Sequence, residues 1–177
     1  MSDPRSAGVV APAPTRSWWC LGTRSTVHIG REQTAGLFTL VELAAAPGVS
    51  TPRHVHRLED EALLLRDGAL RVECGDDVVE AGPGTTVFLP QRVPHSFTVV
   101  SDGPVLAWQV LAPAGYEDLL AALGEPANAP ALPPAREVDE RRVTDVAARH
   151  GVDVLGWPGP RRPTVTTRTT GDKEESW

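Results

Sequence analysis

Short apolar runs, broken by glycine, proline and aspartate, dominate the chain from Ser17 to Pro113. Runs of this length, closely spaced and without intervening helical periodicity, are typical of β-strands. The Asp67-Gly68 pair and the segment 75–77 predict hairpin turns, because glycine and aspartate tolerate the backbone angles that such turns need. We therefore expect an all-β barrel or sandwich, with strands over 18–21, 26–29, 37–43, 53–56, 61–65, 69–74, 78–80, 86–89, 96–100 and 105–111.

The hydrophobic pattern changes to a helical period after Gly115. A first helix is predicted over 116–123, and a second is predicted to begin at Asp139, which can cap it, and to end at Gly151. A proline- and alanine-rich linker separates them. The chain is thus predicted to comprise a flexible leader (1–16), a β-barrel (17–113), a short C-terminal helical extension (114–157) and a polar tail, disordered or in contact with a partner (158–177).

Composition and charge argue against nucleic-acid binding and against a membrane-spanning protein. The 177 residues include 17 Lys and Arg against 23 Asp and Glu, a formal charge of −6, so nucleic-acid binding is not expected. The sequence shows no signal-peptide core and no apolar run near the ~18 residues that a membrane span requires. We therefore expect a cytoplasmic protein whose two cysteines, Cys20 and Cys74, are reduced.

Two histidines and a glutamate form the first part of a candidate metal site. His54 and His56 alternate along a predicted strand, so their imidazoles share one face. Glu61 opens the next strand and shares its parity with Leu63 and Leu65, which places a carboxylate on an apolar inward face. An unpaired carboxylate there would be costly, and a metal ion bound by all three groups would remove that cost.

A third histidine falls in a second segment of the same kind. A strand begins after Gly84 and ends at Pro90, and Pro94 fixes the entry to another strand that opens with His95. If that strand lies opposite the first, His95 completes a site of three imidazoles and one carboxylate. Such donors suit one divalent transition metal ion, whether Fe, Mn, Ni, Co, Cu or Zn.

This spacing resembles the two motifs of the cupin superfamily. The first motif is matched at every defined position, by Gly48, His54, His56, Glu61 and Gly68. The second is matched by Gly84, Pro90 and His95, whereas Arg92 replaces a glycine and Val99 an asparagine. The short distance between the motifs looks like the small bacterial single-domain cupins, many of which are quercetin 2,3-dioxygenase-like. The resemblance implies an antiparallel jelly-roll barrel holding a metal between His54, His56, Glu61 and His95.

The resemblance leaves three functions open. The first is an O2-dependent dioxygenase acting on a small enolic or phenolic substrate, with Glu61 as the catalytic proton acceptor. The second is a redox-neutral cyclase, isomerase or decarboxylase of secondary metabolism that uses the metal as a Lewis acid. The third is a non-catalytic cupin that binds a small molecule.

Residues other than the four ligands are assigned to the pocket, to an exposed loop or to a subunit contact. The residues expected to line the substrate pocket are Leu63, Phe97, Trp108 and His28, with Trp108 also able to serve as core. Glu59 and Asp60 are expected to be exposed loop acids without a function. A homodimer is expected, because a barrel edge needs covering, with Trp18, Trp19 and Leu64 as candidate contacts.

Overall fold

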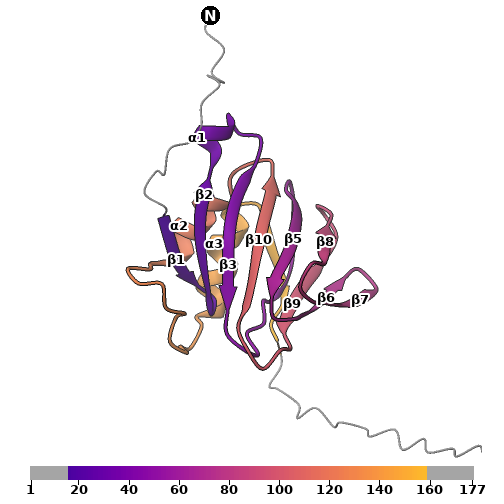
Figure 1. Cartoon of the computed structure of the whole chain (residues 1–177). Helices are drawn as coiled ribbons and strands as arrows, with labels where there is room; N and C mark the ends of the chain where they lie inside the picture. The colour runs from indigo at the N-terminus through magenta and orange to yellow at the C-terminus, as the bar shows by residue number, and fades with distance from the viewer. Residues whose placement is uncertain (1–15, 159–177) are drawn as a thin grey trace, which may run out of the picture.

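The computed structural model describes residues 16–158, so nearly all of the predicted leader and tail lies outside the described residues (Figure 1). The strands are β1 (Arg16–Cys20), β2 (Thr23–Ile29), β3 (Thr39–Ala45), β4 (Arg53–His56), β5 (Asp60–Asp67), β6 (Leu70–Cys74), β7 (Asp77–Ala81), β8 (Thr86–Leu89), β9 (His95–Val99), β10 (Val105–Ala112), β11 (Glu125–Pro126) and β12 (Val152–Gly156). The helices are α1 (Arg31–Thr34), α2 (Tyr116–Leu123) and α3 (Glu140–Arg149). No helix among the described residues has both the length and the apolar character of a membrane span.

Two antiparallel sheets form the body of the molecule. One has seven strands in the order β11-β1-β2-β3-β10-β5-β8, and the other has five in the order β12-β4-β9-β6-β7. The predicted all-β fold is confirmed, but the sheets are not closed into the single barrel that was expected. On the side of β1, the apolar faces of α2 and α3 pack on β12 through Leu119, Val146 and Val152. These helices fill the space between the two sheet edges, so no hydrogen-bonded ladder joins them (Figure 1).

Alternation along the strands separates the interior from the outer surface. On β5, Glu61, Leu63 and Leu65 are buried, whereas Leu64 and Arg66 are exposed. Strand β10 follows the same rule with every odd-numbered residue from 105 to 111 buried. The main core lies between the two sheets and consists of Leu43, Ala45, Leu63, Leu65, Leu70, Val72, Ala81, Leu89, Phe97, Val99, Val105 and Ala107.

The C-terminal extension contributes strands as well as the two helices expected. Strand β11 pairs with β1, and β12 pairs with β4, so that Val152 lies opposite His56 and Val154 opposite His54. Neither strand is predicted from the sequence, since each is short and its partner lies far away along the chain. The pairing makes β4, which carries two of the candidate ligands, an internal strand of its sheet.

Two glycines of the cupin motifs allow a matched test of the turns. Gly68 and Gly84 both have left-handed backbones, with φ of 73° and 83°. A Cβ at Gly68 would lie 2.7 Å from the carbonyl oxygen of Pro104, whereas a Cβ at Gly84 would meet no atom within 4 Å. Gly84 therefore needs only its conformational freedom, and Gly68 also needs the absence of a side chain.

We predict that Gly84→Ala lowers the free energy of unfolding by ~1–2 kcal/mol, the cost of a left-handed alanine. Gly68→Ala should cost a further ~1–3 kcal/mol, because the contacted backbone cannot move aside freely. Urea unfolding of the metal-free proteins measures both changes. Equal losses in the two variants would contradict the tight contact at Gly68.

Candidate metal centre

The two sheets bring the four candidate ligands together. Strand β4 carries His54 and His56 on one sheet, and His95, the first residue of β9, pairs directly with His54. Glu61 faces them from β5 of the other sheet. One potential ligand atom from each of these four residues lies within 4.8 Å of the others. The interior face of each sheet thus supplies part of a single buried cluster.

Backbone carbonyls orient two of the imidazoles. The Nδ1 atom of His54 lies 2.9 Å from the carbonyl oxygen of Pro52, and that of His95 lies 2.9 Å from the carbonyl oxygen of Val93. Because a carbonyl can only accept a hydrogen bond, both Nδ1 atoms carry the proton, and both Nε2 atoms keep a free lone pair. The Nε2 atom of His95 is buried without a hydrogen-bond partner, as suits a nitrogen that binds a metal.

Glu61 lies between the imidazoles and a buried amide. Its Oε2 atom lies 3.5 Å from Nε2 of His56 and 3.7 Å from Nε2 of His95. Its Oε1 atom accepts a hydrogen bond of 2.9 Å from Nε2 of Gln109, and both side chains are buried. The amide therefore fixes one carboxylate oxygen and leaves the other directed at the cluster.

The electrostatics favour the protonation states that a metal ion needs. Burial acts to raise the pKa of Glu61, but the interactions with His95, His56 and His54 outweigh it and hold that pKa at about 2. Burial, together with the neighbouring His95 and His56, lowers the pKa of His54 to about 3. At neutral pH the carboxylate is ionised and His54 is neutral, which fits coordination of a divalent metal.

Two further residues beside the cluster, Gln109 and Tyr116, were not identified from the sequence as part of the site. The parity of Gln109 matches the buried side of β10, but the sequence does not say which side of that strand faces inward. Tyr116 opens α2, and its ring centroid lies 6.0 Å from that of His56. Burial raises the pKa of Tyr116, and Cys20 and Glu61 add to the rise. No local signal marks this tyrosine, because only the chain's return over the sheets brings it there.

Glu59 corrects one sequence expectation outright. It is only 8% exposed, so it is not the exposed loop acid that was predicted. Its Oε2 atom lies 3.5 Å from Nδ1 of His56. The short loop after β4 turns this side chain back toward the histidine three residues earlier.

The expected pocket residues separate onto two faces. Leu63 and Phe97 point into the core between the sheets. Trp108 has the opposite parity to Gln109 and lies on the outer face, where it meets His28 edge-on at 5.0 Å and Arg66 at 5.5 Å. Trp108 and His28 therefore do not line the space around the four ligands. They contact each other instead.

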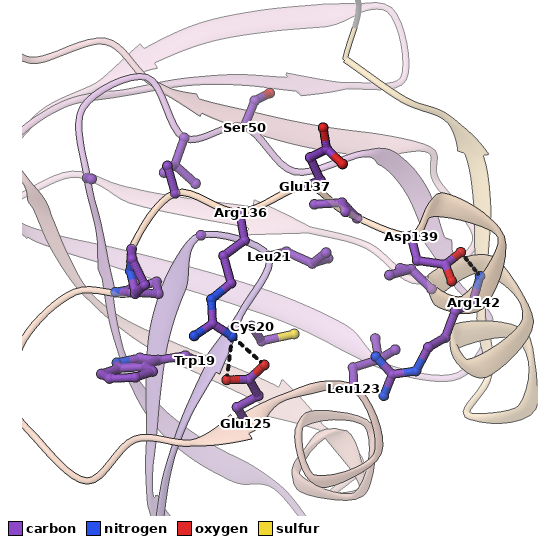
Figure 2. A pocket seen from close by; sticks show the side chains of 18 of the residues that line it. Trp19, Cys20, Leu21, Ser50, Leu123, Glu125, Arg136, Glu137, Asp139 and Arg142 are labelled. Atoms are coloured by element: carbon purple, nitrogen blue, oxygen red, sulfur yellow. Dashed lines mark hydrogen bonds and ion pairs between the residues drawn. The ribbon is translucent and has the colours of Figure 1, made fainter.

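A pocket of about 430 Å³ opens at the turn between β1 and β2, where residues 133–143 cross it (Figure 2). Trp19, Cys20 and Leu123 form part of its wall, and Arg136 binds Glu125 across its rim at 2.6 and 2.7 Å. None of the four candidate ligands lines it. Burial raises the pKa of the Cys20 thiol to about 11, so the cysteine presents an uncharged group to the pocket.

Comparisons with known proteins agree with the geometry. The family model for the cupin domain matches residues 41–111. A curated quercetin 2,3-dioxygenase from Bacillus subtilis is 27% identical over 126 residues, which is 70% of this chain and 37% of that enzyme. The chain thus spans well under half the length of this relative.

Solved structures share the fold. A predicted oxalate decarboxylase from Thermotoga maritima superposes with a TM-score of 0.54 at 15% identity, covering 60% of this chain and 99% of that one. An RmlC-like cupin from Shewanella frigidimarina gives a TM-score of 0.52 at 14% identity, covering 66% and 99%. Fold, ligand motif and family match lead to one conclusion: residues 41–111 of this chain form a cupin domain.

Proposed function

We propose that the protein is a metal-dependent dioxygenase that adds O2 to a small enolic or phenolic substrate. The observation that carries the proposal is the buried cluster of His54, His56, His95 and the ionised Glu61. A divalent transition metal held there would supply Lewis acidity and one-electron chemistry toward O2. Imidazole and carboxylate donors suit several metals of this kind.

Glu61 is the residue best placed to move a proton. It is ionised, and one of its oxygens faces the cluster while Gln109 holds the other. A carboxylate so held can accept the proton of a substrate hydroxyl and turn a weakly binding enol into an anion. Leu63 and Phe97 border the same interior and keep it apolar, which excludes water from a reactive substrate anion.

The curated relative supports the oxygenase and suggests the substrate class. Quercetin is a flavonol, a phenol that also carries an enol, and the family match over residues 41–111 spans both cupin motifs. Because this chain corresponds to 37% of that enzyme's length, a flavonol is a proposal to test and not an inherited property.

Tyr116 favours a second candidate, the redox-neutral cyclase, isomerase or decarboxylase. Its buried phenol stays protonated, since burial raises its pKa, and its ring lies 6.0 Å from His56. A protonated phenol and the ionised Glu61, both beside His56, form a donor and acceptor pair of the kind that proton-transfer chemistry uses. A non-catalytic cupin would bind the same ligands without turnover. The cytoplasmic location and the homodimer stay predictions.

We predict that His56→Ala lowers the metal bound per chain several-fold. Removing one of four ligands weakens the site and also removes the rise in melting temperature that bound metal produces. Metal analysis after dialysis, together with thermal melts with and without chelator, measures both effects. The control is His150→Ala, a histidine at the end of α3, which should keep its metal. Unchanged metal content in His56→Ala would refute the site.

Oxygen consumption separates the two enzymatic candidates. With a flavonol or another enol as substrate, the metal-loaded protein should consume O2 and substrate in equal amounts. Glu61→Gln should lower turnover per bound metal by ~10²–10⁴-fold, because the amide cannot accept the proton. An oxygen electrode and chromatography of the products report both quantities. Equal product yield in an anaerobic chamber would instead establish the redox-neutral reaction, and ligand binding without product would indicate the binding protein.

A further inference from the structure

We infer that Glu59 is a positioning residue for the metal centre, acting as the carboxylate partner of His56. This inference rests on the metal site proposed above but does not depend on the reaction catalysed there. It assigns a function to a loop acid that lies within the first cupin motif but at none of its defined positions.

The three imidazoles differ in the group that faces their Nδ1 atom. His54 and His95 each direct Nδ1 at a backbone carbonyl oxygen at 2.9 Å. His56 has no such carbonyl, and its Nδ1 atom is buried without a hydrogen-bond partner. The group that faces this nitrogen is Oε2 of Glu59, at 3.5 Å. That oxygen is also buried and also lacks a hydrogen-bond partner.

These two unsatisfied atoms are matched to each other. A buried N–H and a buried carboxylate oxygen each cost free energy when unpaired, and a small shift of either side chain would join them. Among the described residues, Glu59 lies within ion-pair distance of His56 and of no arginine. The carboxylate therefore has no competing charged partner there.

The segment that enters α2 lies beside Glu59. Gly115 passes above it, and a Cβ there would lie 3.8 Å from Oε1 of Glu59 and 2.9 Å from Nη2 of Arg31. The absence of a side chain at Gly115 thus leaves room for Arg31, whereas the distance to Glu59 is that of an ordinary contact. Because Gly115 directly precedes α2, the start of the C-terminal extension lies beside Glu59, which is buried.

A carboxylate at this place changes the metal ligand itself. It fixes the proton on Nδ1 of His56, directs the Nε2 lone pair inward and makes that nitrogen a stronger donor. A charged acceptor does this more effectively than a carbonyl. The charge of Glu59 also adds to that of Glu61, so two buried carboxylates balance one divalent cation.

The test compares three variants by their affinity for Zn²⁺, measured by competition with a chromophoric chelator. Glu59→Ala should bind Zn²⁺ ~10–100-fold more weakly, because His56 loses its orienting partner. Glu59→Gln should lose less, since its amide oxygen can still accept from Nδ1–H. The matched control is Asp60→Asn, the same acid-to-amide change in the adjacent residue, whose Oδ1 accepts from the backbone N–H of Gln91 instead. Its affinity should stay within about twofold of wild type, since a partly exposed charge is well screened.

A second readout distinguishes positioning from a merely structural role. Long-range ¹H–¹⁵N spectra of the Zn²⁺-loaded protein should show a slowly exchanging Nδ1 proton on His56, which Glu59→Ala abolishes while the signals of His54 and His95 persist. The metal-free Glu59→Ala protein should melt no lower than wild type, because it loses an unsatisfied buried carboxylate. Wild-type Zn²⁺ affinity in Glu59→Ala, or an equal loss in Asp60→Asn, would overturn the inference. Neither measurement uses substrate, so failure of the proposed dioxygenase activity would leave it standing.

Discussion

The buried carboxylate of Glu61 is the constraint on which the rest of the site depends. An ionised group on an apolar face is stable only if other groups replace its lost hydration. Gln109 does so from the neighbouring strand, and the imidazoles of His56 and His95 do so from the opposite sheet. The cluster therefore requires both sheets at a fixed separation. The apolar layer of Leu63 and Leu65, on the same face of β5, helps to hold them there.

The C-terminal extension completes this arrangement and is not an appendage to it. Strand β12 pairs with the strand that carries His54 and His56, which fixes their backbone from the outer side. Helix α2 places Tyr116 beside His56, and the residue before that helix lies beside Glu59. Metal ligands thus come from the two sheets, whereas the groups around them come from a later part of the chain. Changes in the extension can alter the chemistry without touching a ligand.

Parity along the strands explains how much of the site the sequence could predict. The His-x-His spacing and the shared parity of Glu61 and Leu63 placed these side chains on inward faces, because strand periodicity is a local property. The same rule does not say which face of β10 is inward, and the bulk of Trp108 suggested the opposite choice to the one found. Glu59 was misjudged because a loop acid looks exposed until the segment covering it is known. Strand β12 gave no signal, since its pairing is long-range.

Arg92 shows a different limit of sequence reasoning. It occupies a glycine position of the second motif, yet its backbone keeps the left-handed conformation, with φ of 62°. Its N–H donates a 2.7 Å hydrogen bond to the carbonyl oxygen of His56. This tertiary bond ties the turn before β9 to the ligand strand and stabilises a conformation that arginine alone would avoid. The hydrogen bond to His56 thus determines the conformation of the turn, and glycine is only the preferred residue type at this position.

The choice of face on β10 is tied to the site itself. A shift of one residue would reverse the faces of the strand, burying Trp108 and moving Gln109 to the surface. Glu61 would then lose its amide donor, and the carboxylate would be left with the imidazoles alone. Trp108 would in turn leave its contacts with His28 and Arg66. Both losses oppose the shift. The Glu61–Gln109 pair inside and the Trp108–His28 pair outside therefore specify the same register. The geometry needed to bind a metal thus also helps to define the fold.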